Sequence, residues 1–85
     1  MSYRLLLSPD SNDFLNKLDK PAKERIEKKL RELKNNPELG KPLTGNLASL
    51  WSLRVGDYRA VYQILKEEII ILVLKIGHRK NIYEA

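Results

Sequence analysis

The two-residue segment Gly56-Asp57 lies between two runs of strand-forming residues, and no other feature of this 85-residue chain constrains its fold as strongly. Such a segment predicts a tight hairpin turn, which determines the residues that face each other across the two strands. Val55 then lies opposite Tyr58, and Arg54 lies opposite Arg59. Continuing outward, the predicted pairs are Leu53 with Ala60, Ser52 with Val61, and Trp51 with Tyr62. One face of the hairpin is therefore expected to form core, from Trp51, Leu53, Val55, Tyr58, Ala60 and Tyr62.

The other face of the predicted hairpin carries Arg54 and Arg59 side by side. Like charges that face each other across a sheet lower its stability unless an anion lies between them. The pair therefore indicates an anion-binding surface. A splayed, solvated pair is the alternative, because arginines are common on ordinary protein surfaces.

Hydrophobic periodicity predicts the remaining elements. Residues 3–7 are expected to form a strand, and Ser8 followed by Pro9 predicts a short helix through residue 18. A second helix is expected over residues 21–35, and breaker residues then predict a loop over 40–46. The hairpin strands, 50–55 and 58–65, continue into a third strand over 69–76, which is apolar on both faces and is expected to lie inside the sheet.

The turn before the third strand determines its register, and Lys66-Glu67-Glu68 contains no glycine to specify a turn type. A three-residue loop places Leu65 opposite Ile69 and Arg59 opposite Lys75, so that Lys75 extends the row of cations. A two-residue loop would turn Lys75 inward, which is costly. With the three-residue loop, the residues that join the core are Ile70, Leu72, Leu74 and Ile76.

Together these elements predict one α+β domain over residues 1–85. It has an N-terminal strand, a helical hairpin and an antiparallel three-stranded meander, with the helices packed on one face of the sheet.

Composition limits the chemistry that this domain can perform. The chain has no cysteine and one histidine, which argues against disulfides, thiol-ligated metals and imidazole metal sites. Its longest apolar run, residues 69–74, is too short to span a bilayer, and no secretion leader is recognisable, so a soluble cytoplasmic protein is expected. A net charge of +5 favours nucleic acid or an acidic protein as partner. Membrane binding is not expected, because the basic helix interleaves its lysines with glutamates.

Three motifs resemble those of the RelE/ParE superfamily of bacterial and archaeal toxins: Leu43-Thr-Gly45, the run from Trp51 to Tyr62, and His78-Arg79-Lys-Asn-Ile-Tyr83. The order of elements is also similar, and the resemblance spans essentially the whole chain. It implies a toxin of a type II toxin–antitoxin pair that enters the ribosomal A site and cleaves messenger RNA. In such enzymes the ribose 2′-OH attacks the adjacent phosphate, without a metal or another cofactor.

The resemblance also implies roles for individual residues. Arg59 matches an arginine that contacts the scissile phosphate, Arg79 matches a second arginine, and Tyr83 matches a terminal tyrosine that stacks on a base or transfers a proton. Histidine side chains titrate near neutral pH, so His78 is a candidate for proton transfer, with a surface or hydrogen-bonding role as the alternative. The residues expected to bind RNA are Lys41, Arg54, Lys75 and Lys80.

The chain departs from related toxins in the residues that would supply a general base. Leu50 and Ser52 occupy positions where one branch carries lysines, and no acid lies between Lys41 and Leu50, where another branch carries a glutamate. The base therefore remains open among His78, Tyr83, Lys41 and Lys80, and a catalytically inactive homologue is an alternative. A toxin of the ParE type, which inhibits DNA gyrase by binding alone, is another.

Any toxin of this kind implies partners. An acidic, RelB-like antitoxin is expected to lie across the basic sheet face or the helices. The ribosome and messenger RNA are the expected targets. The toxin alone is expected to be monomeric and to form higher assemblies through the antitoxin.

Overall fold

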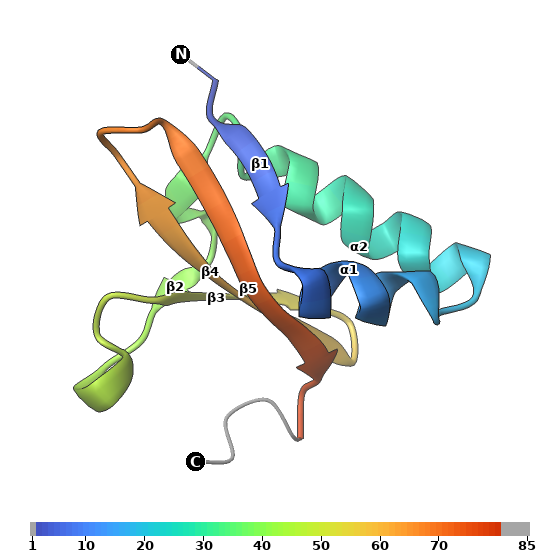
Figure 1. Cartoon of the computed structure of the whole chain (residues 1–85). Coiled ribbons are helices and arrows are strands. Elements are labelled where there is room, and N and C mark those ends of the chain that lie inside the picture. The colour runs from blue at the N-terminus through green and yellow to red at the C-terminus, as the bar shows by residue number, and fades with distance from the viewer. Residues whose placement is uncertain (1, 81–85) are drawn as a thin grey trace.

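The computed structural model describes residues 2–80, in which two α-helices pack against a five-stranded mixed sheet (Figure 1). The strands lie side by side in the order β1-β5-β4-β3-β2. Along the chain the elements are β1 (Arg4–Leu7), α1 (Pro9–Asn16), α2 (Lys20–Glu32), the 3₁₀ turn η1 (Pro37–Leu39), β2 (Lys41–Pro42), the 3₁₀ turn η2 (Gly45–Leu47), β3 (Trp51–Val55), β4 (Tyr58–Leu65) and β5 (Ile70–His78). The predicted α+β class is confirmed.

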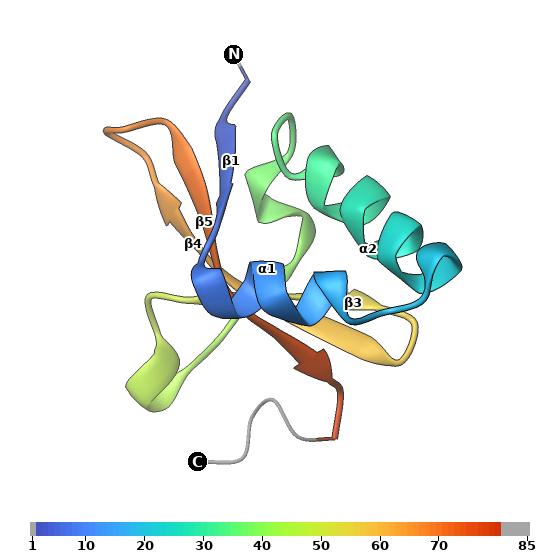
Figure 2. The ribbon, with the colours of Figure 1, turned by 45° about the vertical axis from the view of Figure 1, so that its right-hand side comes forward.

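Both helices lie on the same side of the sheet, as expected (Figures 1 and 2). α1 begins where Ser8 caps it, because the Ser8 hydroxyl accepts a hydrogen bond from the Ser11 N–H at 3.1 Å. The two helices end at Asn16 and Glu32, somewhat earlier than their periodicity predicts. Within residues 2–80 no helix is long and apolar enough to cross a membrane.

The β3–β4 hairpin has the predicted register at all five pairs, from Val55 with Tyr58 to Trp51 with Tyr62. Gly56 has a positive φ of 58°, the backbone conformation that a two-residue turn requires and that glycine adopts without strain. The predicted core face is also confirmed. Tyr62 and Ala60 are buried at its centre, and the other members pack against the same core.

The predicted register of β5 is wrong. Leu65 pairs with Ile70, Val61 pairs with Lys75, and Arg59 pairs with Gly77. The connection therefore contains four residues, including Ile69 at a φ of 59°, and the ladder shifts between Val61 and Tyr62. This shift inserts Leu74 as an extra residue on β5, which is a β-bulge.

The bulge changes the set of core residues on β5. Ile71, Val73 and Ile76 are buried, whereas Ile70, Leu72 and Leu74 are only half-buried, so of the predicted set Ile76 alone is in the buried core. Two serines stabilise the bulge from the helix side. The Ser11 hydroxyl donates to the Val73 carbonyl at 3.1 Å, and the Ser8 hydroxyl donates to the Leu74 carbonyl at 2.8 Å.

The sheet has two further strand pairings beyond the predicted meander. β1 pairs with β5 in parallel, so β5 lies inside the sheet as expected. β2 lies in the segment that its glycines and prolines predict to be a loop, and it pairs antiparallel with the start of β3. A proline at the outer edge of a sheet is tolerated because its missing N–H faces away from the neighbouring strand.

Candidate functional site

Arg54 and Arg59 lie side by side on the sheet, as the hairpin predicts. Arg54 is exposed, and its Nε donates to the Gly56 carbonyl at 3.4 Å. Arg59 is half-buried, and its Nη1 donates to the hydroxyl of Ser52 at 3.3 Å. Ser52 is 3% exposed, so a buried hydroxyl orients the guanidinium of Arg59.

The two arginines line a groove of about 310 Å³. Lys41 joins them from β2, where it is the register partner of Ser52. Residues directly opposed on a sheet have neighbouring side chains on the same face, so the Lys41 side chain begins beside Ser52. The groove, which we call the cationic groove, is lined by Lys29, Leu39, Gly40, Lys41, Ser52, Leu53, Arg54 and Arg59.

Tyr62 anchors the chain segment that carries Lys41. Its hydroxyl donates to the Pro37 carbonyl at 2.6 Å and accepts from the Gly40 N–H at 3.0 Å. Burial raises the pKa of the Tyr62 phenol; the Gly40 hydrogen bond opposes this shift, and nearby Glu38 adds to it. Gly40 lies so close to β3 that a Cβ there would meet the Ser52 carbonyl oxygen at 2.5 Å, which leaves no room for a side chain.

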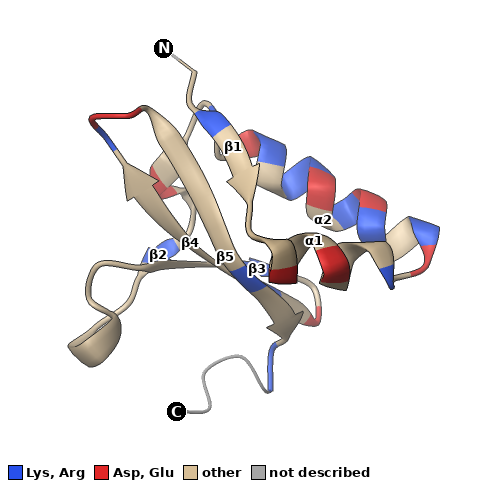
Figure 3. Ribbon diagram, in the orientation of Figure 1, with Lys and Arg blue, Asp and Glu red and all other residues tan. Residues whose placement is uncertain are grey.

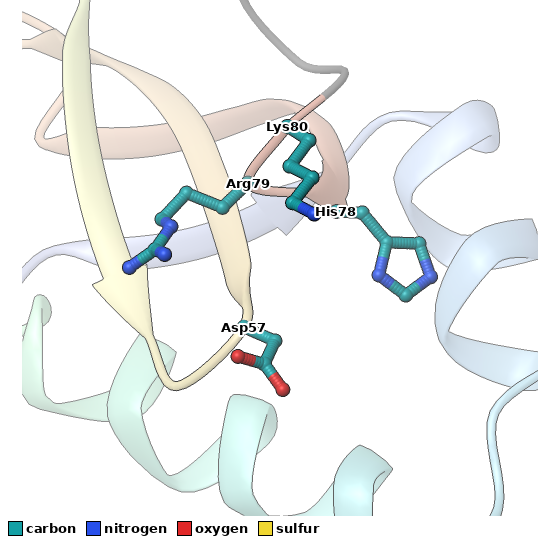
Figure 4. Close-up of a pocket in the computed structure, with 4 residues that line it drawn as sticks. All are labelled: Asp57, His78, Arg79 and Lys80. Atoms are coloured by element: carbon teal, nitrogen blue, oxygen red, sulfur yellow. The ribbon is translucent and has the colours of Figure 1, made fainter.

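A second cavity, of about 420 Å³, lies at the end of β5 and is lined by Asp57, His78, Arg79 and Lys80. The Arg79 N–H donates to the Asp57 carbonyl at 2.8 Å, which fixes the end of β5 to the hairpin turn. His78 and Arg79 point in opposite directions from there, and His78 points toward the helices (Figure 4). The two side chains therefore leave the chain in different directions, although both line this cavity.

Of the other predicted site residues, Lys75 does not line the cationic groove. Lys75 lines a third cavity together with Asp10 and Asp13 of α1, so carboxylates are its neighbours there. Tyr83 lies outside the described residues. Among residues 2–80 no group of three or more histidine, cysteine or acidic side chains is arranged to hold a metal ion.

Reasoning from the sequence alone overlooks three residues of the site. Lys29 lies on a helix that interleaves basic and acidic residues, a pattern typical of a solvated face (Figure 3). The position of Tyr62 on β4 indicates a core residue, but its hydroxyl also binds the segment beside β2. Gly40 directly precedes Lys41-Pro42, and in the sequence it indicates only a loop. The fold shows that it lies against the Ser52 carbonyl and the Tyr62 hydroxyl.

The arrangement of elements agrees with that of known proteins. Residues 5–83 match the family described as the ParE toxin of the type II toxin–antitoxin system parDE. The chain belongs to this toxin family. The resemblance to the RelE/ParE superfamily is thereby confirmed.

Two relatives of this toxin come from Escherichia coli. A RelE-like toxin protein is 29% identical over 83 residues, which cover 95% of this chain and 87% of the relative. The mRNA interferase toxin RelE of strain K12 is 29% identical over 67 residues, which cover 76% of this chain and 70% of the relative.

Solved structures have the same fold as the toxin. A chain of the toxin–antitoxin complex RelBE2 from Mycobacterium tuberculosis superposes with a TM-score of 0.85 at 28% identity, covering 93% of both chains. The isolated RelE toxin of Escherichia coli superposes with a TM-score of 0.77 at 25% identity, covering 91% of this chain and 84% of that one.

Proposed function

We propose that this toxin is a ribosome-dependent endoribonuclease that cleaves messenger RNA in the ribosomal A site. The Arg54–Arg59 pair is the observation that carries the proposal. Two arginines opposed on a sheet repel each other, and an anion between them would remove that repulsion. Arginine suits a phosphate because it stays protonated and donates to two oxygens at once. A relative that is 29% identical over 67 residues is named as an mRNA interferase toxin, which supports the proposal.

The proposed reaction is an internal transfer at one phosphate. The 2′-oxygen forms a bond to phosphorus as the bond from phosphorus to the 5′-oxygen breaks, which leaves a cyclic phosphate and a 5′-OH. The 2′-OH loses a proton and the 5′-oxygen gains one, so the reaction needs a base and an acid. Negative charge builds on the phosphate oxygens during the transfer, and cations positioned there stabilise it.

We assign the charge-stabilising role to Arg59 and Arg79. Ser52 holds the Arg59 guanidinium, and the bond from Arg79 to Asp57 anchors the backbone of Arg79. Lys41, Lys80 and Tyr83 are the candidates for proton transfer, and His78 is a weaker one because it faces the helices. Arg54 would bind the RNA backbone.

We further propose that an acidic antitoxin neutralises the toxin in the cytoplasm, where ribosomes are its target. The net charge of +5 favours such a partner. Solved relatives include toxin–antitoxin complexes from Mycobacterium tuberculosis and Escherichia coli, which support this partner class.

An in vitro translation reaction with purified protein tests the enzymatic proposal, with messenger RNA ends mapped by primer extension. We expect cuts at A-site codons that require ribosomes. Arg59→Ala and Arg79→Ala should each slow cleavage by about 10²–10³-fold, the range for removing one group that stabilises transition-state charge. Tyr83→Phe tests the terminal tyrosine. Arg25→Ala, on the exposed face of α2, is the matched control and should cleave normally.

Intact messenger RNA and unimpaired translation with the wild-type toxin would refute the ribonuclease proposal. A gyrase supercoiling assay would then test the binding-only alternative.

A further inference from the structure

The cationic groove continues past Arg59 and reaches helix α2. The pairing of β2 with β3 ends at Ser52 of β3. The outer edge of the rest of β3 therefore borders the groove. Lys29 lines the groove from α2, where it is half-buried. The groove therefore leads from the proposed site of cleavage, around the edge of the sheet, to the helical layer.

Four cations from four different elements line this groove: Lys29 of α2, Lys41 of β2, Arg54 of β3 and Arg59 of β4. Among the residues that the structure describes, the lining contains no carboxylate. Among the described residues, Lys29 forms an ion pair with Glu32, whose Oε1 lies 3.7 Å from the Lys29 Nζ. Both side chains of this pair are more than two-fifths exposed, at 41% and 47%, so the pair is weak and Lys29 can exchange it for another anion.

We propose that the cationic groove binds the RNA backbone next to the cleaved nucleotide, with Lys29 and Lys41 each contacting a phosphate. This proposal rests on the proposed ribonuclease function and adds a second binding subsite to it. Evenly spaced phosphates suit cations that are spread along a groove. An amphipathic antitoxin segment fits the Lys29 end of the groove less well, because such segments bind through apolar anchors. The apolar lining residues are Leu39, which is half-buried, and Leu53, which is 3% exposed.

The salt dependence of RNA binding tests this proposal directly. The probe is a fluorescein-labelled single-stranded RNA of about 12 nucleotides, within the range of single-strand site sizes, with 2′-O-methyl riboses that prevent cleavage. For each phosphate that a variant no longer binds, the slope of log K against log salt should become shallower by about 0.7. We expect this change for Lys29→Gln and for Lys41→Gln, and twice the change for the double variant. Lys28→Gln, an exposed neighbour on α2 outside the groove, should leave the slope unchanged.

Several results would overturn the proposal. One is an unchanged slope in both groove variants, and another is an equal change in Lys28→Gln, which would mean that any lysine on α2 contributes. A third is weaker binding of an acidic antitoxin peptide with an unchanged RNA slope, which would make the groove an antitoxin contact. Thermal unfolding should give the same melting temperature for Lys28→Gln and Lys29→Gln, so that misfolding does not imitate weaker binding.

The ribosome assay separates this proposal from the proposed function. If the wild-type toxin cleaves messenger RNA but the slopes do not change, the groove proposal fails and the enzymatic one stands. If the slopes change as expected but no cleavage occurs, the groove binds RNA and the enzymatic proposal fails. Absence of any RNA binding by the wild-type toxin would overturn the groove proposal, and the ribosome assay would still decide the enzymatic one.

Discussion

The imidazole of His78 lies against the ring of Tyr58, with the ring centroids 5.0 Å apart and an angle of 35° between the planes. Phe14 of α1 contacts both rings edge-on, at 6.0 Å from Tyr58 and 6.2 Å from His78. β5 therefore ends in an aromatic cluster on the helix side of the sheet. From its sequence position His78 is a candidate for proton transfer, but its neighbours favour a packing role.

Replacing His78 with phenylalanine should preserve ribosome-dependent cleavage, because phenylalanine keeps the ring contacts. His78→Ala should lower the free energy of unfolding by about 0.5–1.5 kcal/mol, the typical contribution of an aromatic pair. Primer extension and denaturant unfolding measure the two effects. A loss of cleavage of about 10²-fold or more in a folded His78→Phe variant would instead identify His78 as a general acid or base.

Gly40→Ala should destabilise the toxin and distort the cationic groove. A Cβ at this position meets the Ser52 carbonyl carbon at 2.9 Å and the Tyr62 hydroxyl at 2.8 Å, so the segment before β2 must move. We expect a loss of about 1–3 kcal/mol in unfolding free energy, the usual cost of overpacking, together with weaker RNA binding. Ser49→Ala, at an exposed loop position, is the control. Wild-type stability in Gly40→Ala would show that the close approach to β3 is not rigid.

Tyr62→Phe should lower stability at neutral pH by about 1–3 kcal/mol, because the Pro37 carbonyl and the Gly40 N–H both lose their partner. Urea unfolding of the two proteins measures this difference, and wild-type stability in Tyr62→Phe would show that water replaces the hydroxyl.

The raised pKa of Tyr62 predicts that the stability of the toxin depends on pH. The pKa of Tyr62 is raised in the folded toxin, chiefly by burial, so above pH about 10 the unfolded chain loses this proton first. The Tyr62 contribution to stability is therefore complete below the unfolded pKa and is lost as pH rises toward the folded pKa. The stability difference between wild type and Tyr62→Phe should shrink over this alkaline range. A constant difference would contradict the raised pKa.

Arg54→Glu should weaken the complex with the acidic antitoxin, because it places a carboxylate on the basic face of the hairpin. Titration calorimetry at moderate salt measures the affinity, and raising the salt concentration should reduce the difference between variant and wild type. Arg25→Glu controls for the same change in net charge at an exposed position on α2. Equal affinity of Arg54→Glu and wild type would exclude this face from the antitoxin interface.

Ser8→Ala should destabilise the toxin by about 0.5–2 kcal/mol, the range for losing an N-cap side chain. The variant also removes the donor to the Leu74 carbonyl at the bulge of β5. Thermal unfolding, with Ser49→Ala as the exposed-serine control, should show the loss for Ser8→Ala alone. Equal melting temperatures would mean that another group caps α1.

Local chemistry in the sequence was sufficient to predict the β3–β4 hairpin and the pairing of Arg54 with Arg59. A two-residue loop with glycine at its first position admits few turn types, and alternation along the strands then determines which side chains face the core. Ser8-Pro9 likewise predicted the start of α1. A capping side chain and a proline at the first helical position act on neighbouring backbone groups, so both can be recognised in the sequence.

Tertiary contacts decided the elements that local chemistry left open. Ser8 and Ser11 bind the Val73 and Leu74 carbonyls across more than sixty residues of chain, and they hold a bulge that no turn signal in the sequence announces. Gly40-Lys41-Pro42 contains loop-forming residues, yet β3 recruits it as an edge strand, and Tyr62 anchors the segment just before it.

The sequence by itself determined the toxin family and the cationic hairpin, because motifs and short loops depend on neighbouring residues. Only the tertiary structure decided that Lys75 lies beside carboxylates, that His78 faces the helices, and that Lys29 joins the groove. These positions depend on strand register and helix packing, which arise from contacts between residues far apart along the chain.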